Sequence, residues 1–385
     1  MRVAILILNY NGRDLLAECL PSVLHAAGNS SHVCEVVIID NDSSDDSCEY
    51  LAANFSNVKV IAKPNRGLCS FNDVIEAENS RAYDIALLLN NDIKLHANAV
   101  DPLVEPFEEQ LRQPDVAAPV FLTAPLCWQF DGVTCEGFKS AVGWRWGLVQ
   151  ATGRFPGHQQ VLRIPGETAC AGAALAVDCR LFRELGGFDS LFLPGRLEDL
   201  DLAFRAWQRG WKLRYVPAAI AYHKGQVSFA REFGRSGCDQ LALRNTLLFQ
   251  RKNIRHPINV LRQFFGHALR AARDIVLAPV AAKEARWPFL RAWTEARKVW
   301  REHQGSGGAA AHQYSLTYRQ QIKSERDFFR RFTASRLLSE SRGQPVEYAI
   351  MPDPALDAVQ GLGPAASLIG KRGDIANNRA EDFRD

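Results

Sequence analysis

The sequence predicts an α/β fold, a three-layer α/β/α sandwich with a mainly parallel central sheet, followed by a helical C-terminal extension. Runs of apolar residues without polar alternation are typical of strands buried on both faces of a parallel sheet. Segments with apolar residues at helical spacing separate the runs. Polar residues follow each run directly. The four predicted strands are Val3–Leu8, Glu35–Asp40, Val58–Ala62 and Ile85–Leu89.

The polar clusters after the four strands predict one shared binding site. They occupy positions 9–11, 40–42, 65–67 and 90–92. In parallel sheets, ligands bind beyond the carboxyl ends of the strands. No G-x-G-x-x-G or Walker A motif follows a strand, so a dinucleotide site and a P-loop are excluded. Acids facing a phosphorylated ligand would repel it without a divalent cation between them, which indicates a metal-bridged diphosphate.

Composition places the chain among ordinary soluble proteins. Its 385 residues are 47% hydrophobic and 23% charged, enough for one large domain with appendages or for two domains. Nine scattered cysteines form no C-x-x-C pair, which argues against a zinc site or disulfide framework and favours a reducing compartment. Neither a signal peptide nor a run of 18 apolar residues is recognisable, so we expect a cytoplasmic protein.

The rest of the chain divides by pattern. Positions 114–168 are irregular, after which Cys170–Val177 predicts a strand, 198 onward a helix, and Leu213–Val216 and Ala219–Tyr222 two short strands. Helical patterns then extend to about residue 338, and the Pro- and Gly-rich remainder is expected to be poorly ordered. The predicted units are a catalytic domain at 1–230 (halves 1–113 and 114–230), a helical extension at 231–342 and a disordered tail at 343–385.

Three carboxylates open the helix that begins near residue 198. Leu200, Ala203, Phe204 and Trp207 give it an apolar stripe, and Glu198, Asp199 and Asp201 occupy its first turn. Acids at a helix start commonly complement the helix dipole. A carboxylate there can also act as a general base, and the residues alone leave both interpretations open.

These motifs resemble family 2 glycosyltransferases, in the same order and over residues 2–228. Within that family the chain is most similar to the bacterial rhamnosyltransferase-like branch that builds surface polysaccharides. The motifs that carry the resemblance are Asn9-Tyr10-Asn11-Gly12, Asp40-Asn41-Asp42, Asn65-Arg66-Gly67, Asn90-Asn91-Asp92, Gly186-Gly187-Phe188-Asp189, Glu198-Asp199-Leu200-Asp201 and Tyr222-His223.

The resemblance implies a GT-A fold, a nucleotide-diphospho-sugar donor, Mg²⁺ or Mn²⁺, and inversion at the anomeric carbon. Asp199 takes the position of the family's base, and Asp92 and His223 those of its metal-binding residues, with phosphate as an alternative partner of the histidine. The first acid of the family's Asp-x-Asp is Asn90 here, so another ligand must complete the metal site. The implied donor-binding residues are Asn9, Tyr10, Asp40, Asp42, Asn65, Gly67 and Asn91.

The acceptor is expected to be a glycan or lipid-linked glycan. Glu198, Asp201 and Arg205 would lie on its side of the site, and Trp144 and Trp146 either stack on its sugars or belong to the core. Two alternatives remain from different classes. One is a sugar-phosphate nucleotidyltransferase, which should carry a basic glycine-rich loop after the first strand. The other is an inactive GT-A-like binding protein.

Positive charge concentrates at 251–302, where twelve Lys and Arg face four Asp and Glu, although the net charge of the chain is only +3. Aromatic residues interleave with these cations, as in helices that lie on membranes. No nucleic-acid recognition motif accompanies them, so nucleic acid is not an expected partner. Packing on the catalytic domain and peripheral contact with the inner face of the cytoplasmic membrane both stay open.

Overall fold

The computed structural model describes residues 1–77, 82–112, 118–137, 139–225, 227–280, 287–305 and 317–340. The predicted disordered tail at 343–385 lies outside the described residues, as do the side chains of 226–231. None of the helices in these ranges is both long enough and apolar enough to span a bilayer.

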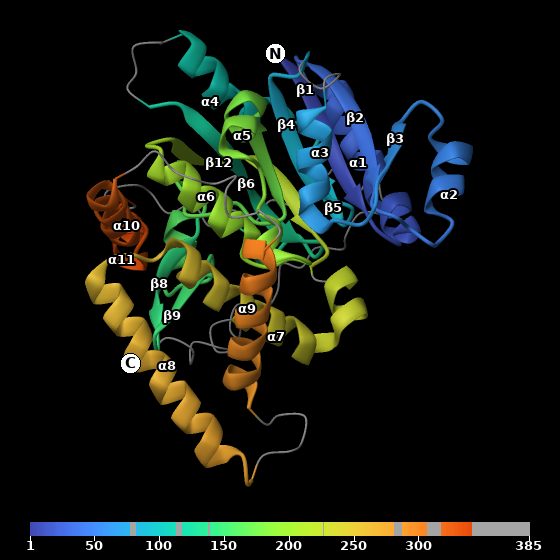
Figure 1. Cartoon of the computed structure of the whole chain (residues 1–385). Helices are drawn as coiled ribbons and strands as arrows, with labels where there is room; N and C mark the ends of the chain where they lie inside the picture. Colours follow the sequence, from blue (N-terminus) through green and yellow to red (C-terminus); the bar gives the residue numbers. More distant parts are fainter. Residues whose placement is uncertain are drawn as a thin grey trace, which may run out of the picture.

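The first four predicted strands are confirmed and pair in parallel in the order β4-β1-β2-β3 (Figure 1). Ile5 lies opposite Val36 on one side and Leu87 on the other, so the carboxyl ends of β1, β2 and β4 meet at one edge. The elements are β1 (Arg2–Asn9), α1 (Arg13–Asn29), β2 (Val33–Asp40), α2 (Ser47–Asn54), β3 (Lys59–Ala62), α3 (Ser70–Glu76) and β4 (Ile85–Asn90).

The second half extends the same sheet with antiparallel pairs. β11 runs antiparallel to β4 and to β6, whereas β12 runs parallel to β6, so the ten-stranded sheet is mixed beyond β4. Its elements are β5 (Ile93–Leu95), α4 (Val100–Arg112), β6 (Val120–Gln129), β7 (Cys135–Gly137), β8 (Ala141–Arg145), β9 (Leu148–Thr152), β10 (Gly166–Glu167), β11 (Ala174–Asp178), α5 (Cys179–Leu185), α6 (Glu198–Gln208) and β12 (Lys212–His223).

Two local expectations are wrong. The stretch expected to be irregular contains the ten-residue strand β6, where Pro125 and Thr123 interrupt the apolar pattern that usually announces a strand. The two short strands expected at 213–222 form one strand, β12, with a register shift between Val216 and Ile220. A bulge adds residues on one side of a strand pair and thus hides the continuity of a strand in the sequence.

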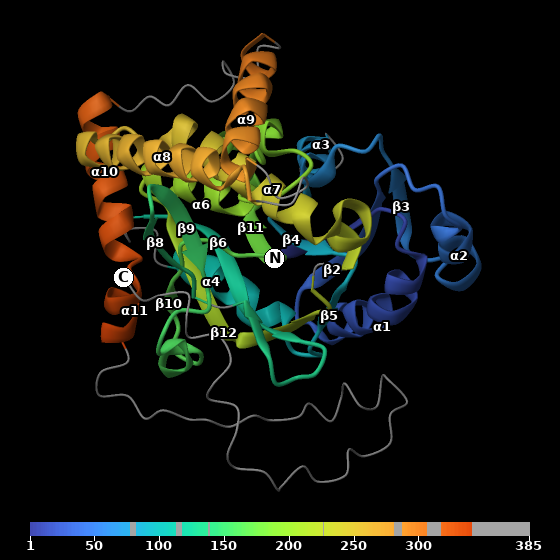
Figure 2. The ribbon, with the colours of Figure 1, turned by 90° about the horizontal axis from the view of Figure 1, so that it is seen from below.

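The sheet is covered on both faces, which confirms the three layers (Figures 1 and 2). Along β1, Val3, Ile5 and Ile7 pack in the core under α1 and α4, whereas Ala4 and Leu6 face the core shared with α3, α5 and α6. This alternation follows from the two-residue period of a strand. The continuous apolar run in the sequence therefore serves two cores.

The C-terminal helices pack on the second of these cores. In α10, Phe328 is fully buried, with its ring 4.9 Å from Phe204 and 5.9 Å from Trp207 of α6. The helices thus share one core with the sheet. The predicted domain boundary at residue 231 remains a prediction. The extension comprises α7 (Val227–Asn253), α8 (Pro257–Leu277), α9 (Pro288–Gly305), α10 (Tyr318–Arg331) and α11 (Ala334–Ser339).

Candidate active site

The ends of β1 and β2 join through a buried hydrogen-bond network. Asn9 Nδ2 donates to Asp40 Oδ1 and to Ser43 Oγ, each at 3.2 Å. The Ser43 amide donates to Asp40 Oδ2 at 3.1 Å. Tyr10 and Asp42 are exposed beside this network. The buried pair is thus held in place by the protein, while the two exposed side chains are available to a ligand.

Asn41 connects this network to the third strand end. Its Nδ2 donates to Asn65 Oδ1 at 3.0 Å, and its Oδ1 accepts from Ser70 Oγ at 2.6 Å. Gly67 has a φ of +50°, and a Cβ there would lie 2.9 Å from the carbonyl oxygen of Pro194. The backbone approaches too closely for any other residue. This contact brings the loop ahead of α6 against the donor-side strand ends.

The fourth strand end is tied to the first. Asn91 Nδ2 donates to Asn9 Oδ1 at 2.9 Å. A Cβ on Gly12 would lie 2.0 Å from that same Nδ2, so the glycine allows the two asparagines to meet. Asn91 is therefore placed in the predicted cluster, although its side chain is engaged by the protein itself.

Asp92 and His223 are brought together by the pairing of β5 with β12, which sets His223 opposite Ile93. His223 Nε2 lies 3.3 Å from Asp92 Oδ2, and Nδ1 lies 3.7 Å from Oε1 of Glu136. Burial lowers the pKa of His223, but the two carboxylates outweigh it and raise the pKa to about 9. Glu136, in β7, was not among the residues predicted from the sequence.

This arrangement fits a divalent cation. Asp92 Oδ1 is buried and has no hydrogen-bond partner among the described residues, as expected of an oxygen left for a ligand. A cation bound here would displace the proton from Nε2 of His223, and a carboxylate beside Nδ1 favours the tautomer that offers Nε2 to a metal. In the described ranges no three His, Cys, Asp or Glu side chains form a complete metal site. The remaining ligands would therefore come from the donor diphosphate or water.

Asp199 is held beside the end of β4. Its Oδ2 accepts from the Gly172 amide at 3.0 Å, and its Oδ1 accepts from the Leu200 amide at 2.8 Å. The carbonyl oxygen of Ala173, the residue after Gly172, accepts from the Asn90 amide at 3.3 Å. Only Asn91 lies between Asn90 and Asp92 in the chain. The base predicted from the sequence and the metal-side strand end therefore adjoin the same short backbone segment.

Glu198 has a different environment from its neighbour. Its Oε2 is buried without a hydrogen-bond partner in the described part of the chain. Burial, together with the adjacent charge of Asp199, raises the pKa of Glu198 to about 8. This carboxyl is accordingly protonated at neutral pH and is a poor acceptor of a further proton.

Asp201 and Arg205 do not face an acceptor, which corrects their expected position. Both side chains are fully buried, with Arg205 Nε 2.7 Å from Asp201 Oδ2. Lys252 Nζ adds a second ion pair to Asp201 at 2.8 Å. Burial alone would raise the pKa of Asp201, but Lys252 and Arg205 lower it. Sequence reasoning could not distinguish these charges from exposed ones, because the first turn of a helix, where Asp201 lies, and its last turn, where Arg205 lies, usually face solvent.

Removing one member of this network should destabilise the fold. We expect Asp201→Ala to lower the free energy of unfolding by about 3–5 kcal/mol, because Arg205 would remain fully buried without the carboxylate at 2.7 Å and Lys252 would keep only its ion pair with Asp189. Urea denaturation followed by circular dichroism measures the change. Glu184→Ala, which removes an exposed partner of Arg209, should cost less than about 1 kcal/mol. Equal losses in the two variants would contradict this account.

Asn245 of α7 also supports the site and was not predicted. Its buried Nδ2 lies 2.8 Å from the carbonyl oxygens of Phe192 and Gly195 and 2.9 Å from that of Arg196. These carbonyls belong to the loop that leads into α6. A lone Asn in a helical stretch of sequence carries no signal for this contact.

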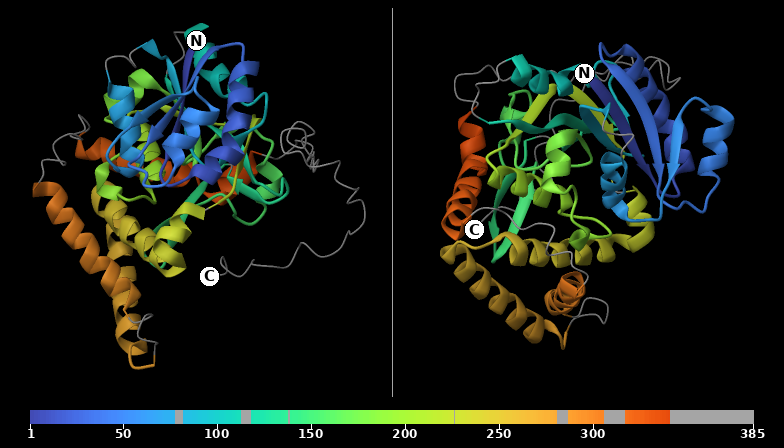
Figure 3. Two further views of the ribbon diagram at one scale, coloured as in Figure 1. Left: turned by 90° about the vertical axis from the view of Figure 1, so that its right-hand side faces the viewer. Right: turned by 45° about the horizontal axis from the view of Figure 1, so that its top comes forward.

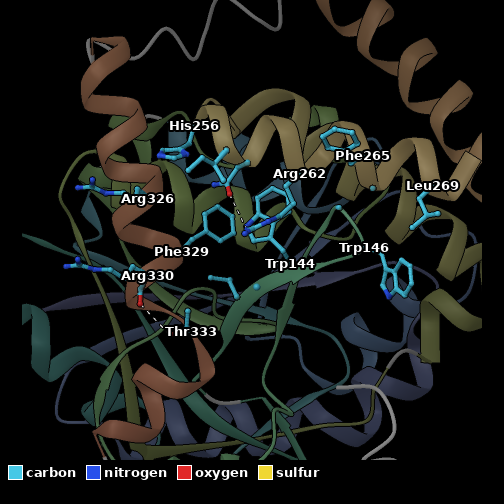
Figure 4. Close-up of a pocket in the computed structure, with 16 residues that line it drawn as sticks. Trp144, Trp146, His256, Arg262, Phe265, Leu269, Arg326, Phe329, Arg330 and Thr333 are labelled. Carbon is cyan, nitrogen blue, oxygen red and sulfur yellow. Dashed lines mark hydrogen bonds between the residues drawn. The ribbon is translucent and has the colours of Figure 1, made fainter. Parts of the chain in front are cut away.

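The two predicted acceptor-stacking tryptophans lie on a different element from Asp199. Trp144 and Trp146 lie on the β8–β9 hairpin and line a cavity of about 750 Å³ bounded by α8 and α10 (Figure 4). The Trp144 ring is 5.3 Å from Phe329, whose neighbour in α10 packs on Trp207. Trp207 is eight residues beyond Asp199, about 12 Å along α6. Acceptor contact through these tryptophans therefore remains a proposal for a distant part of the acceptor.

Comparison with known proteins identifies the N-terminal region. Residues 4–122 match the family model described as Glycosyl transferase family 2. The chain contains a family 2 glycosyltransferase domain. Its fold is of the GT-A type: a structure of GalNAc-T7 with UDP, GalNAc and Mn²⁺ superposes with a TM-score of 0.50 at 17% identity, covering 81% of this chain and 58% of that one.

Curated relatives of this glycosyltransferase domain are distant. Putative polypeptide N-acetylgalactosaminyltransferase 10 of Drosophila melanogaster is 25% identical, over 50% of this chain and 31% of its own length. N-acetylglucosaminyl-diphospho-decaprenol L-rhamnosyltransferase of Mycobacterium tuberculosis is 24% identical, over 54% of this chain and 70% of its own. The chain spans about a third of the length of the first of these relatives.

Proposed function

We propose that the protein is an inverting glycosyltransferase that moves a sugar from a nucleotide-diphospho-sugar to an acceptor hydroxyl. The observation that carries this proposal is that the strand end before Asp92, whose carboxylate oxygen is unpartnered, and Asp199 both hydrogen-bond to the backbone segment 172–173, beside a region that matches the family 2 model. The nucleoside would bind beside Asp40 and the exposed Asp42 and Tyr10. Asn65 and Gly67 would shape the same side of the donor site.

Transfer would proceed by direct displacement. Asp199 accepts the proton of the acceptor hydroxyl. The hydroxyl oxygen bonds to the anomeric carbon of the donor sugar as the bond between that carbon and the nucleoside diphosphate breaks. One base is sufficient for this step, in contrast to glycoside hydrolysis with two working carboxylates. A divalent cation held by Asp92 and His223 would supply positive charge to the departing diphosphate.

The acceptor is proposed to be a glycan or lipid-linked glycan of a cell-surface polysaccharide. The support is the name of the mycobacterial relative, a rhamnosyltransferase that acts on a sugar diphosphate of decaprenol. The cavity beside Trp144 and Trp146 would hold a part of the acceptor remote from the reacting hydroxyl. Contact of residues 251–302 with the cytoplasmic face of a membrane would bring the enzyme to a lipid-linked acceptor.

A panel of UDP-, GDP- and dTDP-sugars with Mg²⁺ or Mn²⁺ tests this function. One donor should raise the melting temperature in a metal-dependent way and release nucleoside diphosphate, and NMR of the product should show an inverted anomeric configuration. Retention of configuration would contradict the displacement step. Formation of pyrophosphate from a nucleoside triphosphate and a sugar phosphate would instead favour a nucleotidyltransferase, and stabilisation without turnover a binding protein.

A further inference from the structure

Helix α8 turns an apolar face away from the protein. Nine of its apolar side chains are between 42% and 73% exposed. Three of them, Ile258, Phe265 and Leu269, border the cavity beside Trp146, and the other six are not among the residues that line it. At 3.6 residues per turn, eight of the nine fall on one half of the helix, whereas Leu277, at its end, falls on the side of Asn259. The helix lies at the outer margin of the molecule (Figure 3). These side chains are Ile258, Val260, Leu261, Phe264, Phe265, Leu269, Ile275, Val276 and Leu277.

Three polar residues of α8 face the protein instead. Asn259 Nδ2 donates to Glu325 Oε1 at 2.8 Å, and Arg270 Nε donates to the carbonyl oxygen of Trp146 at 3.0 Å. Asp274 accepts from the Phe289 amide at 2.9 Å at the start of α9. A helix on the surface of a soluble protein normally has the opposite orientation, with its apolar stripe in the core.

Close packing fixes this orientation. A Cβ on Gly266, on the inward side of α8, would lie 2.3 Å from the Cα of Gly147 in the β8–β9 turn. The helix thus cannot rotate its apolar face inward without losing this contact and the polar ones. The exposed apolar face belongs to the folded state.

The surroundings of the apolar face are positively charged. Arg273 is exposed on α8, and Arg297 is exposed on α9 with its guanidinium 4.5 Å from the ring of Trp293. Arg262 is also exposed, at the mouth of the cavity, with its guanidinium 5.5 Å from the ring of Trp144. The described acids of this region are engaged: Asp274 caps α9, Glu295 pairs with Arg244, and Glu302 pairs with Lys298. A face of this kind complements a surface that is apolar inside and anionic outside.

We propose that the outward face of α8 docks on an anionic lipid bilayer, with Phe264 and Val276 among the inserted side chains and the arginines at the level of the headgroups. Apolar burial and attraction to anionic lipid would act together, as in interfacial helices. This surface extends the proposed function, because a lipid-linked acceptor would be presented at the same bilayer. It does not depend on the transfer reaction.

Vesicle flotation of the purified full chain tests the proposal. We expect the chain to bind vesicles of phosphatidylcholine with about 30% phosphatidylglycerol, an anionic lipid, and to bind vesicles of phosphatidylcholine alone more weakly. Addition of about 0.5 M NaCl should weaken binding to the anionic vesicles, because salt screens the attraction between charges. The double variant Phe264→Glu/Val276→Glu should partition at least about tenfold less, because charges would replace inserted apolar groups. Phe264 is 67% exposed and Val276 is 73% exposed, so the variant should fold normally, with an unchanged melting temperature.

The matched control is Val33→Glu/Leu111→Glu, which places the same charges at positions 70% and 66% exposed on β2 and α4. It should bind vesicles like the unmodified chain. Absence of wild-type binding, or equal binding by both variants, would overturn the proposal. A wild-type dimer that the α8 variant converts to a monomer, seen by light scattering without vesicle binding, would show that a second copy covers the face. Donor binding is measured without vesicles, so a failure of the proposed glycosyltransferase function can be told apart from a failure of membrane docking.

Discussion

Replacing Asp199 by Asn should lower kcat by about 10²- to 10⁴-fold, the usual contribution of a general base. The amide has nearly the same shape, and its oxygen can still accept from the Gly172 amide that now binds Oδ2 at 3.0 Å. Donor affinity should therefore change by less than about threefold, since only proton acceptance is removed. Initial rates and calorimetric titration with the donor identified by the panel measure the two quantities.

Glu198→Gln is the matched control for this substitution. Because the pKa of Glu198 is raised to about 8, glutamine imitates the protonated form that prevails at neutral pH. Its kcat at pH 7 should stay within about fivefold of the wild-type value. The opposite result, with the Gln variant inactive and Asp199→Asn active, would move the base to Glu198. Comparable loss in both would indicate that the substitutions disturb the start of α6.

The parallel half of the fold was predictable because its signals are local. Each of the strands β1, β2 and β4 is an apolar run closed by a polar cluster, and the structure changes their ends by only a residue or two. The second half depends on pairing between distant segments. β12 spans a register shift that divides its sequence pattern, and its neighbour β6 contains a proline. Such features become intelligible only when the partner strands are known.

The candidate site shows the same division between local and distant signals. Asp92 and Asp199 stand in motifs that can be recognised along the chain. Glu136 reaches His223 only through the pairing of β7, β6 and β12, and Asn245 acts from a different helix. The hydrophobic spacing of α8 likewise reveals an apolar face but does not say that this face points outward.

Replacing Asp92 by Asn should weaken Mn²⁺-dependent binding of the nucleoside diphosphate by about 100-fold or more. The carboxylate loses its charge, and an amide oxygen is a weaker ligand for a hard cation. A second protein carboxylate at this strand end would reduce the loss of Mn²⁺ affinity, but position 90 is already an asparagine. Electron paramagnetic resonance of free Mn²⁺, titrated with protein and the diphosphate that the panel selects, measures binding without turnover.

Two further variants give this prediction its scale. Glu136→Gln leaves Asp92 and His223 in place but removes the charge that faces Nδ1 at 3.7 Å, and it should weaken Mn²⁺ binding about 10-fold, as loss of an orienting partner does. Glu105→Gln makes the same charge change at an exposed position of α4 and should have no effect. A loss of Mn²⁺ affinity that is largest in Asp92→Asn, smaller in Glu136→Gln and absent in Glu105→Gln would indicate a cation held at His223. Unchanged Mn²⁺ binding in Asp92→Asn would place the cation elsewhere, because the unpartnered Oδ1 of Asp92 would then not be one of its ligands.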